Sequence, residues 1–190
     1  MQKKLVRHGY RYTKVYSVVD GIIRRCHDVK KDNYKYYGAK GIFVCDLWRY
    51  NRELFCKWLE DEGFRDGLQV DRIDNTKGYS PDNCRLLPAS FNGINKKGSS
   101  QTGVCGVYFA KDCTIHPYLA TIVLYGKRYD IGRYKTIEEA VTVRKSVTAD
   151  VCNKAAILCK ENKEKSIDDL KPQLALLLEC LVRAVKGATV

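Results

Sequence analysis

The sequence lacks several features that would place it in common protein classes. No C-x-x-C pair occurs among its nine cysteines, although zinc sites usually draw their ligands from such closely spaced pairs. No apolar run approaches the roughly 20 residues that cross a bilayer, and the start MQKK leads into no apolar signal core. We therefore expect a soluble, intracellular protein without structural zinc, whose thiols are reduced and behave as small buried apolar groups.

Positive charge is what the sequence has in excess. Lys and Arg number 34 against 22 Asp and Glu, which gives a net charge of +12 over 190 residues. Residues 1–50 hold 12 basic and 4 acidic side chains, whereas residues 51–100 are balanced. This surplus favours a polyanionic partner, because neutralised phosphates release condensed counterions. A solvated basic face that keeps the chain soluble is the alternative.

A stretch rich in Gly, Ser and Lys at 96–103 separates two patterned regions and is the best candidate for a linker. Apolar spacing and turn-forming residues predict three helices and three strands before it. The helices are expected over 14–26, 52–62 and 88–97, and the strands over 42–45, 68–73 and 84–87.

The region after the linker predicts a small sheet followed by helices. Strands are expected over 106–110, 118–125 and 127–132, with a hairpin turn at Tyr125-Gly126-Lys127. Thr136 and Glu139 have the spacing of a capping box at a helix start. The last helix carries an apolar stripe, expected to be core, with a dimer contact as the alternative. The stripe comprises Leu170, Leu174, Leu177, Leu178, Leu181 and Val185. The fold class is therefore α+β, in two modules.

One segment, VDRIDNTKGYSPDNCRLLPASFNGIN (70–95), carries the chemistry. Asp71 ends one predicted strand and Asn92 lies on the following helix, so the two can face each other if the strands pair and the helix folds back. A hard divalent cation prefers such oxygen ligands, and a site with few of them leaves positions open for phosphate and water. Asn83 begins the second strand and can hold the long loop by side-chain to backbone hydrogen bonds.

This segment resembles the HNH (ββα-metal) nuclease motif of phage-type homing endonucleases. HGYRYTKVY (8–16), GIIRRCH (21–27) and NYKYYGAKGIFVCDLW (33–48) are similar to the leading region of that family, so the resemblance covers about residues 8–97. It implies DNA phosphodiester hydrolysis, with one Mg or Mn ion held by Asp71 and Asn92.

The sequence departs from many family members at Arg72, which stands where they have a histidine base. Arginine stays protonated and cannot accept a proton from water, so Arg72 is better suited to binding the scissile phosphate. Tyr79, His27 and a hydroxide on the metal are the alternatives for the base. A dead site is the further alternative.

The segments GVYFA (106–110) and YLATIVLYGKRYDIGRYKTIEEA (118–140) resemble the plant ethylene-response-factor (Apetala-type) DNA-binding domain, with Tyr118 where Trp is commoner. The resemblance implies a three-stranded sheet in the major groove with a helix packed behind it. The candidate DNA contacts of this module are Tyr108, Lys111, Thr121, Lys127, Arg128 and Arg133.

The first module supplies further candidate DNA contacts: Lys35, Lys40, Asn95, Lys96 and Lys97. Lys35 and Lys40 interleave with Tyr36 and Tyr37, as on a nucleic-acid surface, and a packed tyrosine corner with a solvated rim is the alternative.

Taken together, the sequence predicts a nuclease domain over 1–97, a linker over 98–104, a DNA-binding domain over 105–160 and a C-terminal helical segment over 161–190. The expected activity is that of a metal-dependent HNH homing endonuclease, phage-encoded and acting on double-stranded DNA in the host cytoplasm, as a monomer or homodimer. A non-catalytic DNA-binding regulator is the alternative, and RNA binding is disfavoured because no RNA-reading sheet motif is present.

Overall fold

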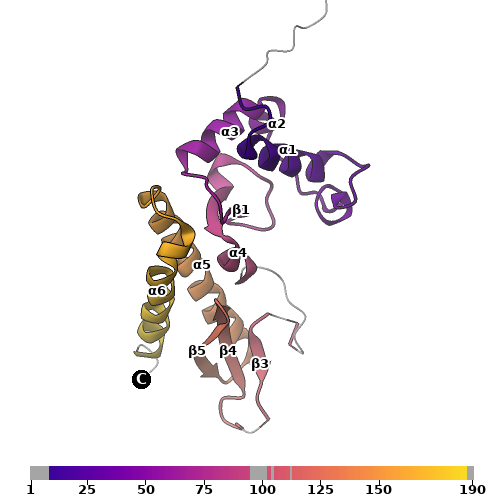
Figure 1. Ribbon diagram of the computed structural model, residues 1–190. Coiled ribbons are helices and arrows are strands. Elements are labelled where there is room, and N and C mark those ends of the chain that lie inside the picture. Colours follow the sequence, from indigo (N-terminus) through magenta and orange to yellow (C-terminus); the bar gives the residue numbers. More distant parts are fainter. Residues whose placement is uncertain (1–8, 95–101, 104, 112, 188–190) are drawn as a thin grey trace, which may run out of the picture. The chain divides into compact units, whose positions relative to one another are not determined.

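The computed structural model describes residues 9–94, 102, 103, 105–111 and 113–187. It is a mixed α+β fold with two small antiparallel sheets (Figure 1). None of the described helices is long and apolar enough to cross a membrane.

The chain forms two compact units. One comprises Met1–Phe64 with Val70–Leu86, and the other Arg65–Gln69 with Leu87–Val190. The predicted division placed the whole strand pair and its following helix in the first module, whereas the observed division runs through both strands. The predicted linker over 98–104 lies mostly outside the described residues.

The first unit is built on α1 (Lys14–His27) and α3 (Arg52–Asp61), which pack against each other. The hydroxyl of Thr13 caps α1 by accepting a hydrogen bond from the backbone N–H of Tyr16 at 3.1 Å. The apolar spacing of both helices predicted them to within one or two residues. Their inner faces bury an apolar stripe, which forms the core of this unit. It includes Val19, Ile22, Ile23, Phe55 and Leu59.

A short helix that the sequence did not predict, α2 (Asp46–Tyr50), precedes α3. It presents Trp48, which is fully buried and stacks on Phe55 with ring centroids 3.9 Å apart and planes 4° from parallel. Two 3₁₀ turns, η1 (Tyr34–Tyr36) and η2 (Gly38–Lys40), connect α1 to this helix.

The strand predicted over 42–45 is wrong as a strand. Only Val44 forms a β-bridge, parallel to Tyr79 in the loop of the following hairpin. Tyr79 N–H donates to the Phe43 carbonyl at 2.7 Å, and Cys45 N–H donates to the Tyr79 carbonyl at 2.9 Å. The segment is extended, but it meets a loop rather than a strand, so no ladder continues beyond this bridge.

The hairpin consists of β1 (Leu68–Arg72) and β2 (Cys84–Pro88), with the 3₁₀ turn η3 (Pro81–Asn83) just before β2. Helix α4 (Ala89–Ile94) follows at once. The sequence predicted Pro88 in the first turn of this helix, whereas Pro88 is the last residue of β2. The rest of the predicted helix, to Lys97, lies outside the described residues.

Cysteines fill apolar positions in both units, as expected. Cys26, Cys56 and Cys84 are buried, and burial raises the pKa of the first two to about 11 and that of Cys84 to about 12. A thiol with such a pKa stays protonated at neutral pH, so these cysteines pack as small apolar groups. Cys180, in contrast, is exposed.

The second unit contains an antiparallel sheet of β3 (Val107–Phe109), β4 (Tyr118–Leu124) and β5 (Lys127–Tyr134), in that order. Tyr125 and Gly126 both have positive φ, 50° and 78°, which makes the two-residue hairpin turn that their sequence predicted. Alternation along β4 places Ala120 and Ile122 on the buried face, and Val123 on the exposed one.

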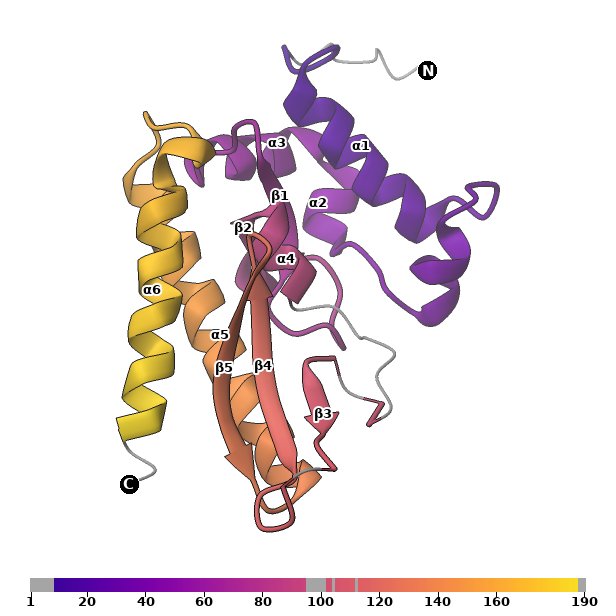
Figure 2. The ribbon, with the colours of Figure 1, turned by 60° about the horizontal axis from the view of Figure 1, so that its bottom comes forward.

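Helices α5 (Ile137–Glu161) and α6 (Ile167–Gly187) complete the second unit. Figure 2 shows α5 behind the sheet and α6 beside it, in agreement with the contacts of α5 with β4 and of α6 with α5 and β5. The predicted capping box is confirmed, because Thr136 and Glu139 exchange side-chain to backbone hydrogen bonds.

Half of the apolar stripe of α6 is core, because Leu170, Leu174 and Leu178 are completely buried. The other members, Leu177, Leu181 and Val185, are half-buried. The core interpretation is therefore confirmed for the first three, and a dimer contact through the others stays a prediction. Residues 161–190 were predicted as a separate segment, but α6 packs on α5 and β5 and belongs to the second unit.

A buried arginine links three elements of the second unit, α5, β4 and α4. Arg144 on α5 donates from Nε to the Thr121 carbonyl at 3.1 Å and from Nη2 to the Ile94 carbonyl at 3.2 Å. Burial lowers the pKa of Arg144, and the two carbonyls supply the hydrogen bonds that a buried cation needs. Gly106 leaves the room for it, since a Cβ there would overlap Nε of Arg144.

We expect Gly106→Ala to destabilise the protein by about 2 kcal/mol or more, because strain at φ 72° adds to the overlap with Arg144. Gly126→Ala is the matched control: φ is 78° there, but nothing lies within 4 Å of the added methyl group. Urea unfolding of the two variants measures the difference. Equal losses of stability would show that the packing around Arg144 tolerates a methyl group.

Candidate functional site

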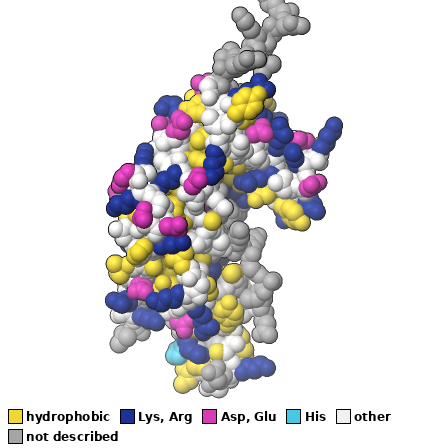
Figure 3. Space-filling model, viewed as in Figure 1, with side chains coloured by type: hydrophobic (Ala, Val, Ile, Leu, Met, Phe, Trp, Pro, Cys, Tyr) yellow, Lys and Arg dark blue, Asp and Glu magenta, His cyan; other side chains and the backbone are white. Residues whose placement is uncertain are grey.

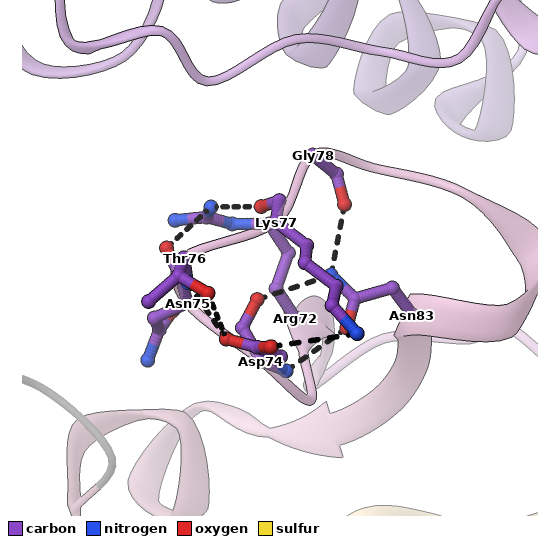
Figure 4. A network of polar contacts seen from close by, with 7 residues as sticks. All are labelled: Arg72, Asp74, Asn75, Thr76, Lys77, Gly78 and Asn83. Carbon is purple, nitrogen blue, oxygen red and sulfur yellow. Dashed lines mark hydrogen bonds and ion pairs between the residues drawn. The ribbon is translucent and has the colours of Figure 1, made fainter.

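Asn83 closes the loop between β1 and β2 from the inside. Its side-chain Nδ2 donates to the carbonyls of Asp74 (3.1 Å) and Gly78 (2.9 Å), and its Oδ1 accepts from the Asp74 N–H at 2.9 Å (Figure 4). The side chain is 7% exposed, so these bonds replace water for the groups involved. The hydrogen bonding that the sequence predicted for Asn83 is therefore confirmed.

Arg72 holds the same loop from the end of β1. Its Nη1 donates to the carbonyls of Lys77 (2.6 Å) and Asn75 (3.0 Å), and the guanidinium carbon lies 5.2 Å from the ring centroid of Tyr79. The sequence assigned Arg72 to phosphate binding. The structure gives it a loop-bracing role through Nη1, and its contact with phosphate stays a prediction.

Asp71 is 4% exposed and forms an ion pair with Arg85 on the neighbouring strand. Both Nε and Nη2 of Arg85 approach the same carboxylate oxygen, Oδ2, at 3.0 and 2.9 Å. Two buried opposite charges stabilise each other's ionised form when they are hydrogen-bonded in this way. The pair fixes the orientation of the carboxylate at the end of β1.

Asn92 is the second predicted metal ligand. It lies on α4, and its side chain is outside the described part of the structure. The convergence of Asp71 and Asn92 on one cation therefore stays a prediction. The predicted DNA contacts Asn95, Lys96 and Lys97 also lie outside the described residues. Among the described residues, no group of three or more His, Cys, Asp or Glu side chains could hold a metal ion.

Tyr79 lies between two arginines. Its hydroxyl accepts a hydrogen bond from Arg25 Nη2 at 2.6 Å, and both Arg25 and Arg72 lie 5.2 Å from its ring centroid. The guanidinium of Arg25 also covers the ring of Tyr37 at 4.5 Å. Burial raises the pKa of Tyr79, although the two arginines oppose the shift. A buried phenol with a raised pKa stays protonated at neutral pH, which disfavours Tyr79 as the base.

His27 is the last residue of α1, and its side chain is hydrogen-bonded to the backbone. Its Nε2 accepts a hydrogen bond from the Val44 N–H at 3.1 Å, so the lone pair that a base would use is engaged. Burial and the charge of Arg49 lower the pKa of His27. The structure thus gives this neutral imidazole the role of holding the segment before α2, and disfavours it as the base.

Lys35 and Lys40 remain available to a partner. Both are exposed, and their Nζ atoms lie 5.1 and 5.7 Å from the ring centroid of the exposed Tyr36. The sequence left open whether the tyrosines here form a nucleic-acid surface or a packed corner. Tyr36 is exposed, as the first alternative requires, whereas Tyr37 is half-buried under Arg25.

The exposed face of the second unit's sheet carries three of the six DNA contacts predicted there. Strand register places Tyr108 beside Leu119, Leu119 beside Arg133, and Val123 beside Arg128. Tyr108, Arg128 and Arg133 are exposed, and Arg128 Nε donates to Asp130 at 2.8 Å.

Two residues predicted to touch DNA do not fit that face. Thr121 is 1% exposed, because its hydroxyl faces the Gly106 carbonyl at 3.5 Å. Lys127 pairs in register with the buried Leu124, and its Nζ bonds Glu179 on α6 at 2.7 Å. Thr121 is therefore too buried to touch DNA, whereas Lys127 is exposed and its DNA contact stays a prediction. Lys111 is exposed beyond the end of β3.

Arg25 and Arg85 are the site residues that the sequence analysis missed. A usable signal existed for Arg85, which interrupts the otherwise apolar strand CRLLP. Since a buried charge needs a partner, an arginine there predicts an acid on the paired strand, and Asp71 was the candidate. Arg25 gave no such signal, because its spacing on α1 does not reveal the distant Tyr79.

Comparison of the chain with models of known protein families, with curated proteins and with solved structures gives no match.

We expect Asn83→Ala to destabilise the first unit by about 2 kcal/mol, because the Asp74 N–H and the Gly78 carbonyl lose their buried partner. The exposed Asn75 offers a control in the same loop, because only its backbone carbonyl takes part in the Arg72 bond. Asn75→Ala should change stability by less than about 0.5 kcal/mol. Thermal unfolding followed by circular dichroism measures both, and equal effects would contradict the bracing role of Asn83.

His27 should make stability pH-dependent. Because its pKa is lower in the folded chain, the unfolded chain binds the proton more readily. The stabilisation is complete above the ordinary pKa of about 6.5 and is lost as pH falls through the lowered pKa. His27→Gln should flatten this acid-side decline in urea unfolding, whereas His116→Gln, in the other unit, should leave it unchanged. An unaltered decline in His27→Gln would contradict this origin.

Proposed function

We propose that the chain is a metal-dependent DNA endonuclease of the HNH homing type, with a second unit that grips double-stranded DNA. The β1–β2–α4 segment would hydrolyse a phosphodiester bond. The second unit would be an ethylene-response-factor-like module that reads the duplex.

The observation that carries the proposal is the β1–β2 hairpin. A buried, oriented carboxylate, Asp71, is the last residue but one of β1. Asn83 braces the loop that follows by hydrogen bonds to the loop backbone. Helix α4 follows β2 without an intervening loop and carries Asn92. Strand, braced loop, strand and helix in this order correspond to the ββα-metal arrangement that the sequence resembles.

The donor chemistry fits one hard cation. Asp71 and Asn92 would offer a carboxylate and an amide oxygen, which suit Mg or Mn better than Zn. When bound, such an ion would supply positive charge for the developing oxyanion and lower the pKa of a water ligand. The buried Arg85 would hold the Asp71 carboxylate in one orientation, as residues beyond the direct metal ligands commonly do.

The remaining side chains would position the substrate. Arg72 and Asn83 would hold the loop in one shape, which limits the reorganisation that cleavage requires. Neither Tyr79 nor His27 suits proton abstraction, because the first is a buried phenol and the second accepts the Val44 N–H. Of the three alternatives for the base, this leaves a hydroxide on the metal ion.

On the second unit, Tyr108, Arg128 and Arg133 would face the DNA from one side of the sheet. A two- or three-stranded ribbon can enter the major groove, and this face carries basic side chains beside apolar ones.

A non-catalytic DNA-binding regulator is the second candidate, favoured by one observation. Oδ2 of Asp71 already bonds both Nε and Nη2 of Arg85, an arrangement that a purely structural ion pair would also show. Metal-dependent strand cleavage separates the two candidates.

The test is cleavage of random-sequence duplex DNA with Mg or Mn, read by sequencing the cut ends. We expect Asp71→Asn to lower the cleavage rate about 100-fold or more, because the carboxylate that would hold the cation is lost. Asp82→Asn is the control, since it removes an exposed carboxylate next to Asn83. DNA retention should be unchanged in both variants.

Loss of one partner from a buried ion pair can destabilise a protein by about 3–5 kcal/mol, so thermal unfolding accompanies the assay of Asp71→Asn. Asn92→Ala is a second, independent variant and should also lose cleavage. Full cleavage by a folded Asp71→Asn protein, or none by the unaltered protein with either metal, would refute the nuclease proposal.

A further inference from the structure

A basic groove runs along α1 in the first unit. It has a volume of about 450 Å³ and is lined by one stripe of the helix together with the segments before and after it. Figure 3 shows dark-blue Lys and Arg side chains gathered over this helix, in the upper right of the view. Arg11 and Tyr12 lie at one end of the lining segments, and Lys31 at the other.

Positive charge dominates the groove. Its lining contains four basic side chains, Arg11, Arg24, Arg25 and Lys31, and one acid, Asp20. Asp20 is itself paired with Arg24 and with Arg52 from α3, each at 2.7 Å. Arg52 lies outside the groove lining and balances the charge of Asp20, so the four lining cations remain as a surplus that an anionic partner would balance.

Gly21 forms part of this groove and has no packing role. It lies in the middle of α1, where glycine is less stable than alanine. It is exposed, and a Cβ placed on it would meet nothing within 4 Å. The absence of a side chain at Gly21 does not improve packing within the fold. It would, however, let a ligand lie close to the helix backbone.

Arg25 joins the groove to the candidate nuclease site. Its side chain lines the groove, and its Nη2 donates to the Tyr79 hydroxyl in the β1–β2 loop. Nε of Arg25 is a buried donor without a hydrogen-bond partner among the described residues. Tyr12, at the other end, is 90% exposed, and Arg11 lies 5.4 Å from its ring centroid.

We propose that this groove binds the sugar–phosphate backbone of double-stranded DNA. Arg24 and Lys31 neutralise successive phosphates, Gly21 lets the backbone lie close to the helix, and Arg25 passes the same strand toward Tyr79. The identity of the polyanion as DNA rests on the proposed nuclease function, whereas the binding of phosphate rests on the groove itself.

The test uses the full chain in EDTA, so that cleavage does not occur, and measures affinity for a random-sequence duplex over a range of NaCl concentrations. Each lost phosphate contact lowers the slope of log K against log salt by about 0.9. Arg24→Ala with Lys31→Ala should therefore lower the slope by about 1.8. Lys57→Ala, on α3 and outside the groove, is the matched control and should leave the slope unchanged.

Gly21→Ala gives an independent readout, because it should raise the thermal unfolding midpoint by about 2 °C and still weaken DNA binding about tenfold. A merely structural glycine would not separate these effects. Unchanged binding in Gly21→Ala, or an unchanged slope in the double variant, would overturn the proposal. So would an equal fall in slope for Lys57→Ala.

Two further arms test the occupant. Duplex RNA of the same sequence and vesicles of anionic lipid are offered to the same variants, and tighter, groove-dependent binding of either would overturn DNA as the partner. Failure of the nuclease proposal looks different: the unaltered protein would cut no DNA with Mg or Mn, while the groove variants would still lose affinity for the duplex.

Discussion

Two side chains, Asn83 and Arg72, hold the long loop between β1 and β2 by donating to its backbone carbonyls. Apart from the turn η3 and the bridge of Tyr79 to Val44, regular structure does not satisfy the polar groups of this loop, so side chains that bracket it do. This constraint sets the place of Tyr79, which in turn pairs with Val44. The candidate nuclease site therefore depends on a few buried polar bonds rather than on apolar packing.

Three arginines make the main polar contacts around the candidate site in the first unit. Arg85 is buried against Asp71, Arg72 supports the loop, and Arg25 connects the Tyr79 hydroxyl to the groove on α1. Each uses the planar, multi-donor guanidinium in a way that a lysine could not reproduce. The basic surplus of the sequence is thus divided between buried arginines that hold the fold and the basic groove that we propose binds phosphate. The net charge alone does not distinguish these two uses.

Much of the fold followed from local pattern. The periods of α1 and α3, the Thr136–Glu139 capping box and the Tyr125-Gly126 turn are all set by neighbours in the chain, and all were predicted. Errors arose where a distant partner decides. The segment 42–45 is strand-like in composition but meets only Tyr79, and Thr121 is buried beside the Gly106 carbonyl instead of facing a partner.

The candidate site divides in the same way. The sequence by itself determined that Asp71, Asn83 and Asn92 stand in a strand–loop–strand–helix order, and that Asn83 can bond its loop, because these depend on spacing and residue type. Only the tertiary structure decided that Arg85 holds Asp71, that His27 is engaged by Val44, and that α1 carries a groove with an exposed glycine. Those contacts join residues far apart in the chain, and their geometry comes from packing, which local sequence does not encode.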